Sequence, residues 1–232
     1  IRLELDRPMA FQAGQYINLH VPFIDSTRAF SIANPPSISG IIDLPVRKVE
    51  GGAGTTWLHD ELQVGQSLDV SGPYGQFFVR KSDPQGAIFI AGGSGLSSPE
   101  SMIMDLLEEG DTRPIYLFQG ARNKAELYHA DHFYQLAEKH DNFHYIPALN
   151  APLPDDAWEG FVGFVHEAVG QFFEQRCSGN KAYLCGPPPM IEAAISTLMQ
   201  SRLFERDIHM EQFLTAADGA TGKVRSALFK RI

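Results

Sequence analysis

The stretch Ala87-Ile88-Phe89-Ile90-Ala91-Gly92-Gly93-Ser94-Gly95-Leu96 decides the fold of this chain. Its first five residues are all apolar, which is typical of a parallel strand that is buried on both faces. The glycines that follow allow a tight turn in which backbone N–H groups and the start of a helix face an anion such as a pyrophosphate. The turn lacks the third glycine of the Rossmann fingerprint and the Gly-Lys-Ser/Thr of a P-loop. By itself it therefore indicates either a nucleotide site or a plain strand-to-helix turn.

The chain after this stretch alternates between strands and helices. Strands are predicted over residues 115–119, 144–147, 182–185 and 208–211, and helices over residues 99–109, 124–140, 166–176 and 189–201. Together with the strand at 87–91, this alternation favours a doubly wound α/β domain with a parallel sheet. Ligands of such sheets bind beyond the carboxyl ends of the strands, and three of these ends carry glycine, at Gly92, Gly120 and Gly186.

The residues before the stretch follow a different rhythm. Short alternating or apolar runs, separated by Gly, Pro and Asp, lie at 15–21, 29–33, 41–49, 67–71 and 77–80. This spacing predicts a small antiparallel barrel or sandwich, with one short helix over residues 56–62. A polar segment, Lys81–Gly86, separates the two rhythms. We therefore expect a first domain over residues 1–82, a second over residues 83–216, and a C-terminal tail over residues 217–232.

The composition narrows the classes of function. With 232 residues, a formal net charge of −9 and 44% hydrophobic residues, the chain is an ordinary acidic globular protein, for which no nucleic-acid partner is expected. No apolar run approaches the roughly 18 residues of a membrane span, so no membrane contact is expected. Two cysteines, Cys177 and Cys185, form no disulfide framework and favour a reducing, cytoplasmic compartment. They are also too few to hold an iron–sulfur cluster. Because the chain starts inside a strand-like pattern, we interpret it as a fragment of a longer protein.

Three further segments carry residue types that suit a nucleotide cofactor. In Arg28-Ala29-Phe30-Ser31 the arginine can fork onto a phosphate, and on a strand the aromatic ring points to the same face. Gly51–Leu58 is a second glycine-rich turn ahead of a short helix, again the geometry of a phosphate site. Cys185-Gly186-Pro187-Pro188-Pro189-Met190 makes a rigid shelf with few backbone donors after a buried strand. Each segment alone is also compatible with a plain strand, a hairpin loop or a buried cysteine.

Taken in this order, the segments resemble the ferredoxin–NADP⁺ reductase-like flavoproteins. Arg28–Ser31 is similar to their Arg-x-Tyr-Ser flavin motif, with Phe30 in place of tyrosine, and Gly52–Thr55 is similar to their Gly-x-x-Ser/Thr pyrophosphate motif. Further similar motifs lie at Phe11–Tyr16, Gly72–Phe77, Ala91–Leu96 and Tyr183–Met190. The resemblance runs over nearly the whole chain. It implies an antiparallel β-barrel FAD domain followed by a doubly wound α/β domain that binds NAD.

A narrower resemblance is to the reductase components of multicomponent phenol hydroxylases. It rests on Gly93–Pro99 and on the ending Phe204–Asp218. In that family a ferredoxin domain with a [2Fe–2S] cluster precedes the flavin domain. The resemblance implies hydride transfer from NADH to FAD and single-electron transfer to the cluster of a ferredoxin domain in the same polypeptide. That domain would supply the oxygenase component of an aromatic, phenol-oxidising monooxygenase. One departure concerns Ser98, since many members of the superfamily have proline there, so the turn is expected to sit differently against the pyrophosphate.

The resemblance also implies the site residues. FAD would contact Arg28, Ala29, Phe30, Ser31, Val46, Lys48, Gly52, Gly54, Thr55, Thr56 and Phe213. The nicotinamide nucleotide would contact Gly93, Ser94, Gly95, Gly120, Arg122, Cys185, Gly186, Pro187 and Pro188. Ser31, Cys185 and Glu211 would lie at the reacting atoms, with Ser31 near flavin N5 and Cys185 beside the nicotinamide, not as a covalent catalyst. For Glu211 and Phe213 a purely structural strand end is an equal alternative.

The preference between NADH and NADPH is argued from the same region. A 2′-phosphate calls for a cation near the end of the second α/β strand, where Arg122 and Lys124 lie. The pattern from Gly120 to Tyr128, however, resembles relatives that use NADH, and we favour NADH. His129 and His132 have helical ligand spacing without an evident third ligand, so no metal site is expected in this chain.

Two other functions stay open from the sequence alone. One is a cytochrome-b5-reductase-like or flavohaemoglobin-type reductase module that passes electrons to haem. The other is a non-catalytic module that keeps the fold to bind a nucleotide or a partner. The sequence that precedes this chain would separate the first, by showing ferredoxin cysteines or globin histidines. A missing flavin, or one that NADH cannot reduce, would indicate the second.

Overall fold

The structure is a computed structural model that describes residues 1–25 and 27–212. Its N-terminal part contains β1 (Arg2–Glu4), β2 (Tyr16–Leu19), β3 (Arg28–Ser31), β4 (Ile41–Asp43), α1 (Ala53–Asp60) and β5 (Val70–Tyr74). All strand pairs here are antiparallel, as predicted: β1 pairs with β4, and β2 lies between β3 and β5. A small core of fully buried side chains, including Ile17, Leu19 and Ile42, lies between these strands.

A closed barrel is not confirmed in this part. Within residues 1–25 and 27–80, hydrogen bonds join the strands into two separate sheets, one of two strands and one of three. Strands β2, β3 and β4 are shorter than the runs predicted for them, β5 begins three residues later than predicted, and residues 77–80 do not form a strand. A proline explains part of the shortening, because a proline has no N–H for the ladder: the run 41–49 contains Pro45, and β4 ends two residues before it.

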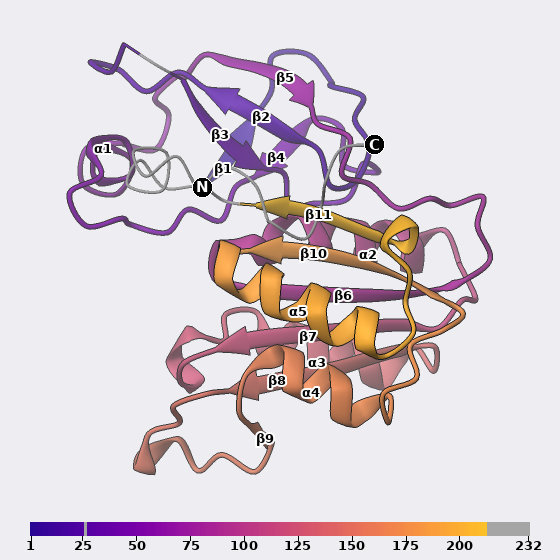
Figure 1. Ribbon diagram of the computed structural model, residues 1–232. Helices are drawn as coiled ribbons and strands as arrows, with labels where there is room; N and C mark the ends of the chain where they lie inside the picture. The colour runs from indigo at the N-terminus through magenta and orange to yellow at the C-terminus, as the bar shows by residue number, and fades with distance from the viewer. Residues whose placement is uncertain (26, 213–232) are drawn as a thin grey trace.

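The second part contains the larger sheet. Its elements are β6 (Gly86–Gly92), the 3-10 turn η1 (Gly93–Leu96), α2 (Ser97–Glu108), β7 (Ile115–Ala121), η2 (Lys124–Glu126), α3 (Ala130–Lys139), β8 (Phe143–Leu149), η3 (Pro154–Asp156), β9 (Phe161–Val162), α4 (Val165–Phe172), β10 (Asn180–Gly186), α5 (Pro188–Gln200), η4 (Glu205–Asp207) and β11 (Ile208–Gln212). The strand order is β11-β10-β6-β7-β8-β9, and every pair is parallel. Figure 1 shows the N-terminal part stacked against the β11 side of this sheet.

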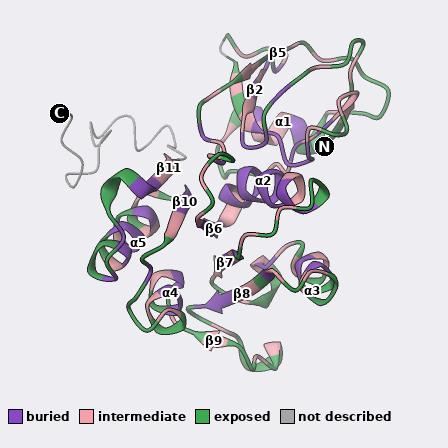
Figure 2. Ribbon diagram, turned by 90° about the vertical axis from the view of Figure 1, so that its right-hand side faces the viewer, coloured by how far each residue is buried: buried purple, intermediate pink, exposed green. Residues whose placement is uncertain are grey.

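The doubly wound arrangement agrees with the prediction. Alternate residues of β6 point to opposite faces: Phe89 packs with α2 and α3, while Ile88 and Ile90 pack with α4 and α5. Figure 2 shows these two helix pairs on opposite sides of the sheet. Every residue of β6 is buried, which is why its sequence is a continuous apolar run. The sheet has a sixth strand, β9, whose two residues are too few for a periodic pattern.

Backbone conformation interrupts one predicted helix and ends another earlier than the sequence predicts. The predicted helix 124–140 is interrupted, because His129 has a left-handed φ of 59° between η2 and α3. The predicted helix 166–176 ends at Phe172, and Glu174 and Gln175 have positive φ values of 46° and 58°. Neither break contains a glycine or a proline, so the sequence has no helix-breaking residue that would predict it. Among the described residues, no helix is long and apolar enough to cross a membrane.

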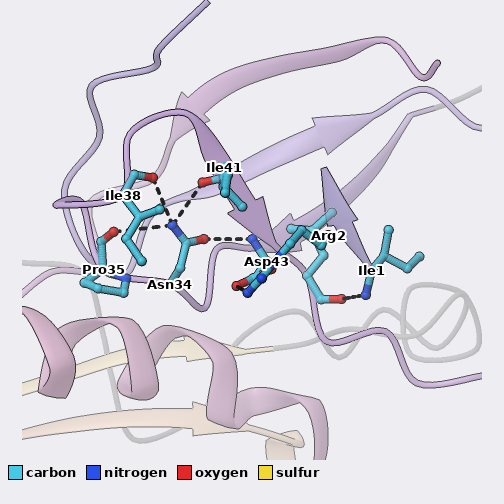
Figure 3. A network of polar contacts seen from close by, with 8 residues as sticks. Ile1, Arg2, Asn34, Pro35, Ile38, Ile41 and Asp43 are labelled. Carbon is cyan, nitrogen blue, oxygen red and sulfur yellow. Dashed lines mark hydrogen bonds and ion pairs between the residues drawn. The ribbon is translucent and has the colours of Figure 1, made fainter. Parts of the chain in front are cut away.

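One buried side chain ties the loop after β3 to both parts. The Asn34 amide donates to three backbone carbonyl groups of residues 35–41, at 3.0 to 3.3 Å, and its Oδ1 accepts from the Asp43 N–H at 2.7 Å (Figure 3). The Asn34 carbonyl accepts a hydrogen bond of 2.8 Å from Ser101 of α2. This network fixes the end of β3, and with it Ser31, against the first turns of α2.

Candidate functional site

A polar cluster lies where the two parts meet. The Ser98 hydroxyl, in the first turn of α2, donates to Glu211 Oε2 of β11 at 3.2 Å, and Cys185 Sγ at the end of β10 lies 4.0 Å from the same oxygen. Ser31, the last residue of β3, is close enough for its hydroxyl to favour the ionised form of Glu211. The structure therefore brings together Ser31, Cys185 and Glu211, which the sequence assigned to the reacting atoms, from three separate strands.

The Ser31 hydroxyl is a candidate ligand-binding atom. The residue is only 6% exposed, yet its Oγ forms no hydrogen bond of ordinary geometry with another described atom. A buried hydroxyl without a hydrogen-bond partner destabilises the fold, so such an atom in a native protein indicates that a bound ligand supplies the hydrogen bond. A flavin edge, which offers both nitrogen acceptors and an N–H donor, fits this requirement.

Burial sets the protonation of the cluster. Desolvation raises the pKa of Glu211, and the Ser98 and Ser31 hydroxyls partly oppose that rise. Desolvation also raises the pKa of Cys185 well above its usual value, the Glu211 charge adds to the rise, and the Ser98 hydroxyl opposes it. A thiol in this environment stays protonated at neutral pH and is a poor nucleophile. Cys185 is thus suited to packing against a ligand rather than attacking one.

The N-terminal part offers a place for a diphosphate. A Cβ on Gly54 would lie 3.5 Å from Arg28 Cγ and 3.6 Å from its Nε, so the arginine runs along the first turn of α1. The N-cap of α1 is Gly52, and no side chain caps the helix. Thr55 fastens the turn, because its hydroxyl donates to the Gly52 carbonyl at 3.2 Å and accepts from the Val49 N–H at 3.0 Å. Uncapped N–H groups beside a guanidinium fit the pyrophosphate of FAD.

The remaining residues predicted to contact FAD lie around this turn. Phe30 is partly buried on β3 and Ala29 is exposed, while Thr56 is partly buried in α1. Lys48 is bound to Asp60 of α1 at 2.7 Å, and the Val46 carbonyl contacts His59 Nε2 at 2.9 Å. Both contacts hold the segment after β4 against α1. Phe213 and the tail 217–232 lie outside the described residues.

A cavity of about 380 Å³ opens at the carboxyl ends of β6 and β7. It is lined by Pro45, Val46, Arg47, Gly93, Ser94, Gly120, Ala121, Glu126 and Tyr128. Three of the residues predicted to contact the nicotinamide nucleotide are among them. The segment Pro45–Arg47 comes from the other part of the chain, so both parts form the wall.

Glycine is required where η1 packs on β10. A Cβ on Gly95 would lie 2.3 Å from the Cys185 carbonyl oxygen, a backbone atom that cannot move aside. The contact places the turn directly beside Cys185, Gly186 and the exposed Pro187. The Tyr128 hydroxyl donates to the Gly93 carbonyl and holds the other end of the turn. The turn is thereby fixed between β10 and the cavity, as a nucleotide phosphate requires.

Four polar or charged residues at this site were not among the residues predicted from sequence. Arg47, Glu126 and Tyr128 line the cavity, and Ser98 belongs to the polar cluster. Arg47 lies between two predicted residues, Val46 and Lys48, and this position in the sequence could have indicated that it belongs to the site. Ser98 was conspicuous only as a departure from proline.

Arg122 is engaged on the protein itself. Its Nε contacts Glu126 Oε1 at 2.8 Å, and a second guanidinium nitrogen contacts the same oxygen. Arg122 is not in the cavity wall, whereas Glu126 is. His129, the first of the two spaced histidines, contacts the buried Glu100 at 2.8 Å. Within the described ranges, no group of three His, Cys, Asp or Glu residues is placed to hold a metal ion.

Comparison with known proteins agrees with this geometry. An oxidoreductase FAD-binding domain matches residues 1–79, and an oxidoreductase NAD-binding domain matches residues 89–195. The chain therefore belongs to the ferredoxin–NADP⁺ reductase-like oxidoreductases, which join these two domains.

Individual relatives narrow the comparison. The whole chain is 71% identical to the phenol hydroxylase P5 protein of Acinetobacter pittii (strain PHEA-2) and 65% identical to the phenol 2-monooxygenase reductase component DmpP of Pseudomonas sp. (strain CF600). It spans 66% of the length of each. Among solved structures, the Amycolatopsis cytochrome P450 reductase GcoB is similar, with a TM-score of 0.83 and 34% identity over 91% of this chain and 64% of that one.

Proposed function

We propose that this chain is the flavin- and nicotinamide-binding part of a reductase that moves hydride from NADH to FAD and passes electrons singly to a [2Fe–2S] centre. The observation that carries the proposal is the meeting of Ser31, Cys185 and Glu211 at the junction of two parts, each of which has its own phosphate-binding turn. When bound, FAD supplies the chemistry that accepts two electrons as hydride and releases them one at a time.

The residues of the chain have the task of binding and alignment. Arg28 and the first turn of α1 would hold the FAD pyrophosphate, Phe30 would stack on the ring system, and the Ser31 hydroxyl would complete its hydrogen bonding on the flavin edge. The turn Gly93–Gly95 would hold the coenzyme pyrophosphate, and the shelf from Cys185 to Pro188 would support the nicotinamide. Holding donor and acceptor in contact, away from water, supplies much of the rate acceleration.

Electron acceptors are proposed from the relatives. Those with high identity are named as a phenol hydroxylase protein and a phenol 2-monooxygenase reductase component. We infer that electrons leave this chain for a [2Fe–2S] ferredoxin domain of the same polypeptide and then reach the oxygenase component of a phenol monooxygenase. Cys177 and Cys185 are both buried and free, so they are poorly placed to hold the cluster.

The domain limits and the location of the protein are part of the same proposal. The two matched domains, at residues 1–79 and 89–195, support a boundary near 82. We also propose that the first domain closes as a barrel around the flavin. We propose a cytoplasmic location from the two free thiols, which fractionation of the source cells tests.

NADH is proposed as the coenzyme in preference to NADPH. A 2′-phosphate brings about two extra negative charges and requires a cation to receive it. The candidate cation, Arg122, is bound to Glu126, and the Glu126 carboxylate itself lines the cavity. Because Arg122 is already paired with Glu126, its guanidinium is less available to a 2′-phosphate, which favours NADH.

The test is an anaerobic titration of the purified chain after addition of FAD. We expect a flavin absorption spectrum that bleaches at about one NADH per FAD, with NADPH far slower. A chain that cannot bind FAD, or that binds a flavin which NADH does not reduce, would overturn the proposal. The same titration on the full-length protein, followed by electron paramagnetic resonance, tests electron delivery: a reduced [2Fe–2S] signal must appear after NADH.

A further inference from the structure

Ser98 is unusual in its position and its contacts. It is the second residue of α2, two residues after the phosphate turn η1, and its side chain is completely buried. Its neighbours Ser97 and Ser101 direct their hydroxyls to backbone carbonyl groups, of Ser94 and Asn34. The Ser98 hydroxyl instead donates to a carboxylate 113 residues away, on the last described strand.

The carboxylate of Glu211 has few other partners. Ser31 faces it from β3, Ser98 from α2 and Cys185 from β10. Within residues 1–25 and 27–212, Cys185 is the titratable group in contact with it, and Glu211 forms no ion pair with a lysine, arginine or histidine. The Ser98 hydroxyl is therefore the donor for which the structure resolves a hydrogen bond to this carboxylate, at 3.2 Å.

We infer that Ser98 is a positioning residue, whose hydroxyl holds the Glu211 carboxyl beside Cys185 at the meeting point of the two parts. The role deepens the proposed function and rests on it, because the carboxyl matters for hydride transfer only if this is the flavin–nicotinamide junction. A residue without a hydroxyl at position 98 would leave Glu211 without this donor.

The physical effect of the hydroxyl has a definite sign. Burial disfavours the charged carboxylate, whereas a hydrogen bond donated to it stabilises the charged form. The start of a 12-residue helix next to the carboxylate acts in the same direction. Removal of the hydroxyl should therefore raise the pKa of Glu211 and release its side chain to other rotamers. Because only Ser97 separates Ser98 from η1, binding of a phosphate at that turn and the position of Glu211 are linked through a short stretch of backbone.

The first measurement follows the carboxyl itself and needs no bound cofactor. The chain is labelled with ¹³C at glutamate carboxyl carbons and titrated by NMR, and the Glu211 signal is assigned by its loss in Glu211→Gln. In Ser98→Ala we expect the apparent pKa of Glu211 to rise by about one unit, the change that one charge-assisted hydrogen bond supports. Ser98→Thr keeps the hydroxyl and should restore the parent value, whereas Ser98→Val, of the same shape without it, should behave like Ser98→Ala.

Ser101→Ala is the matched control. It removes a buried hydroxyl from the same helix, at the same junction, without touching Glu211. It should lower thermal stability but leave the Glu211 titration where it is in the parent. An unshifted titration in Ser98→Ala and Ser98→Val, or an equal shift in Ser101→Ala, would overturn the inference.

The second measurement is the rate of flavin reduction by NADH as a function of pH. We expect its inflection to move to higher pH in Ser98→Ala by the shift seen in the NMR titration, with the KM for NADH little changed, and to return in Ser98→Thr. An inflection that stays in place while the NMR titration shifts would contradict a role in the reaction. Absence of flavin reduction in the parent contradicts the proposed function alone, since the carboxyl titration is independent of it.

Discussion

At the scale of the residue, Arg122 and Glu126 show how one carboxylate changes the coenzyme preference that a nearby cation indicates. From sequence alone, Arg122 favours NADPH as the coenzyme, because a guanidinium beyond the second α/β strand can bind a 2′-phosphate. In the structure it is bound to Glu126, and the Arg122 hydrogen bond is the main reason that the pKa of Glu126 is lowered. The carboxylate thus stays charged at neutral pH, inside the wall of the cavity.

Neutralising this carboxylate should relax the choice of coenzyme. In Glu126→Gln we expect the ratio of kcat/KM for NADPH to that for NADH to rise about tenfold, which corresponds to one modest charge interaction. Steady-state rates with each coenzyme, measured with an artificial electron acceptor, give the ratio. Asp155→Asn removes the same charge from an exposed position of η3 and should leave the ratio unchanged. Equal ratios in parent and Glu126→Gln would show that the charge does not select the coenzyme.

At the scale of the element, the loop between β3 and β4 depends on one side chain. Asn34 bonds to four backbone groups, two in its own loop and two in β4, and so joins strands β3 and β4, which do not pair with each other. The loop also carries the contact to α2, through Ser101. A loop that is fixed in this way behaves as a rigid support for Ser31.

Truncation of this support should be strongly destabilising. Asn34→Ala leaves several buried backbone groups without partners, so we expect the free energy of unfolding to fall by about 2–4 kcal/mol. Urea denaturation of the chain measures the change. Gln63→Ala, which removes an exposed amide, serves as the control and should change stability by less than about 0.5 kcal/mol. A comparable effect of the two substitutions would contradict the role given to Asn34.

The start of α3 contains a pair that responds to pH. The hydrogen bond to Glu100 raises the pKa of His129 above its usual value of 6.5. The pair therefore stabilises the fold fully below about pH 6.5, and this contribution disappears as the pH rises through the higher pKa of the folded state. Asparagine also tolerates the left-handed backbone of residue 129, so His129→Asn isolates the charge effect.

We expect the stability difference between parent and His129→Asn to be larger at about pH 6 than at about pH 8. Urea denaturation at the two pH values gives the difference. Gln63→Ala, which removes an exposed amide and no ionisable group, should show no such dependence. A difference that is constant, or that grows toward high pH, would rule out the Glu100–His129 pair as its source.

At the scale of the whole molecule, the sequence predicted what depends on local pattern. The run Ala87–Ala91 indicated a central parallel strand, and β6 is indeed between β10 and β7, because only a strand covered on both faces is apolar throughout. The break at His129 was missed, since no glycine or proline marks it. The short strand β9 was missed for lack of length.

Contacts between residues far apart in the chain could not be predicted from the local sequence pattern. The bond from Ser98 to Glu211 joins residues 113 positions apart, and periodicity contains no information on such pairs. Ser31, Cys185 and Glu211 were grouped by resemblance to a family, and the fold shows them meeting in space. Arg47 faces the cavity for a similar reason: the packing of two parts against each other, not its own neighbourhood, puts it there.

The strand order also determines when the polar cluster can assemble during synthesis of the chain. Glu211 belongs to β11, which pairs with β10 at the edge of the sheet, whereas Ser31 emerges from the ribosome 180 residues earlier. A nascent chain that has reached residue 200 already possesses both glycine turns and Cys185, but it lacks the carboxyl and the strand that covers β10. Domains fold as units and in order of emergence, so the polar cluster is assembled last. A truncated product would therefore retain both glycine turns without the completed junction.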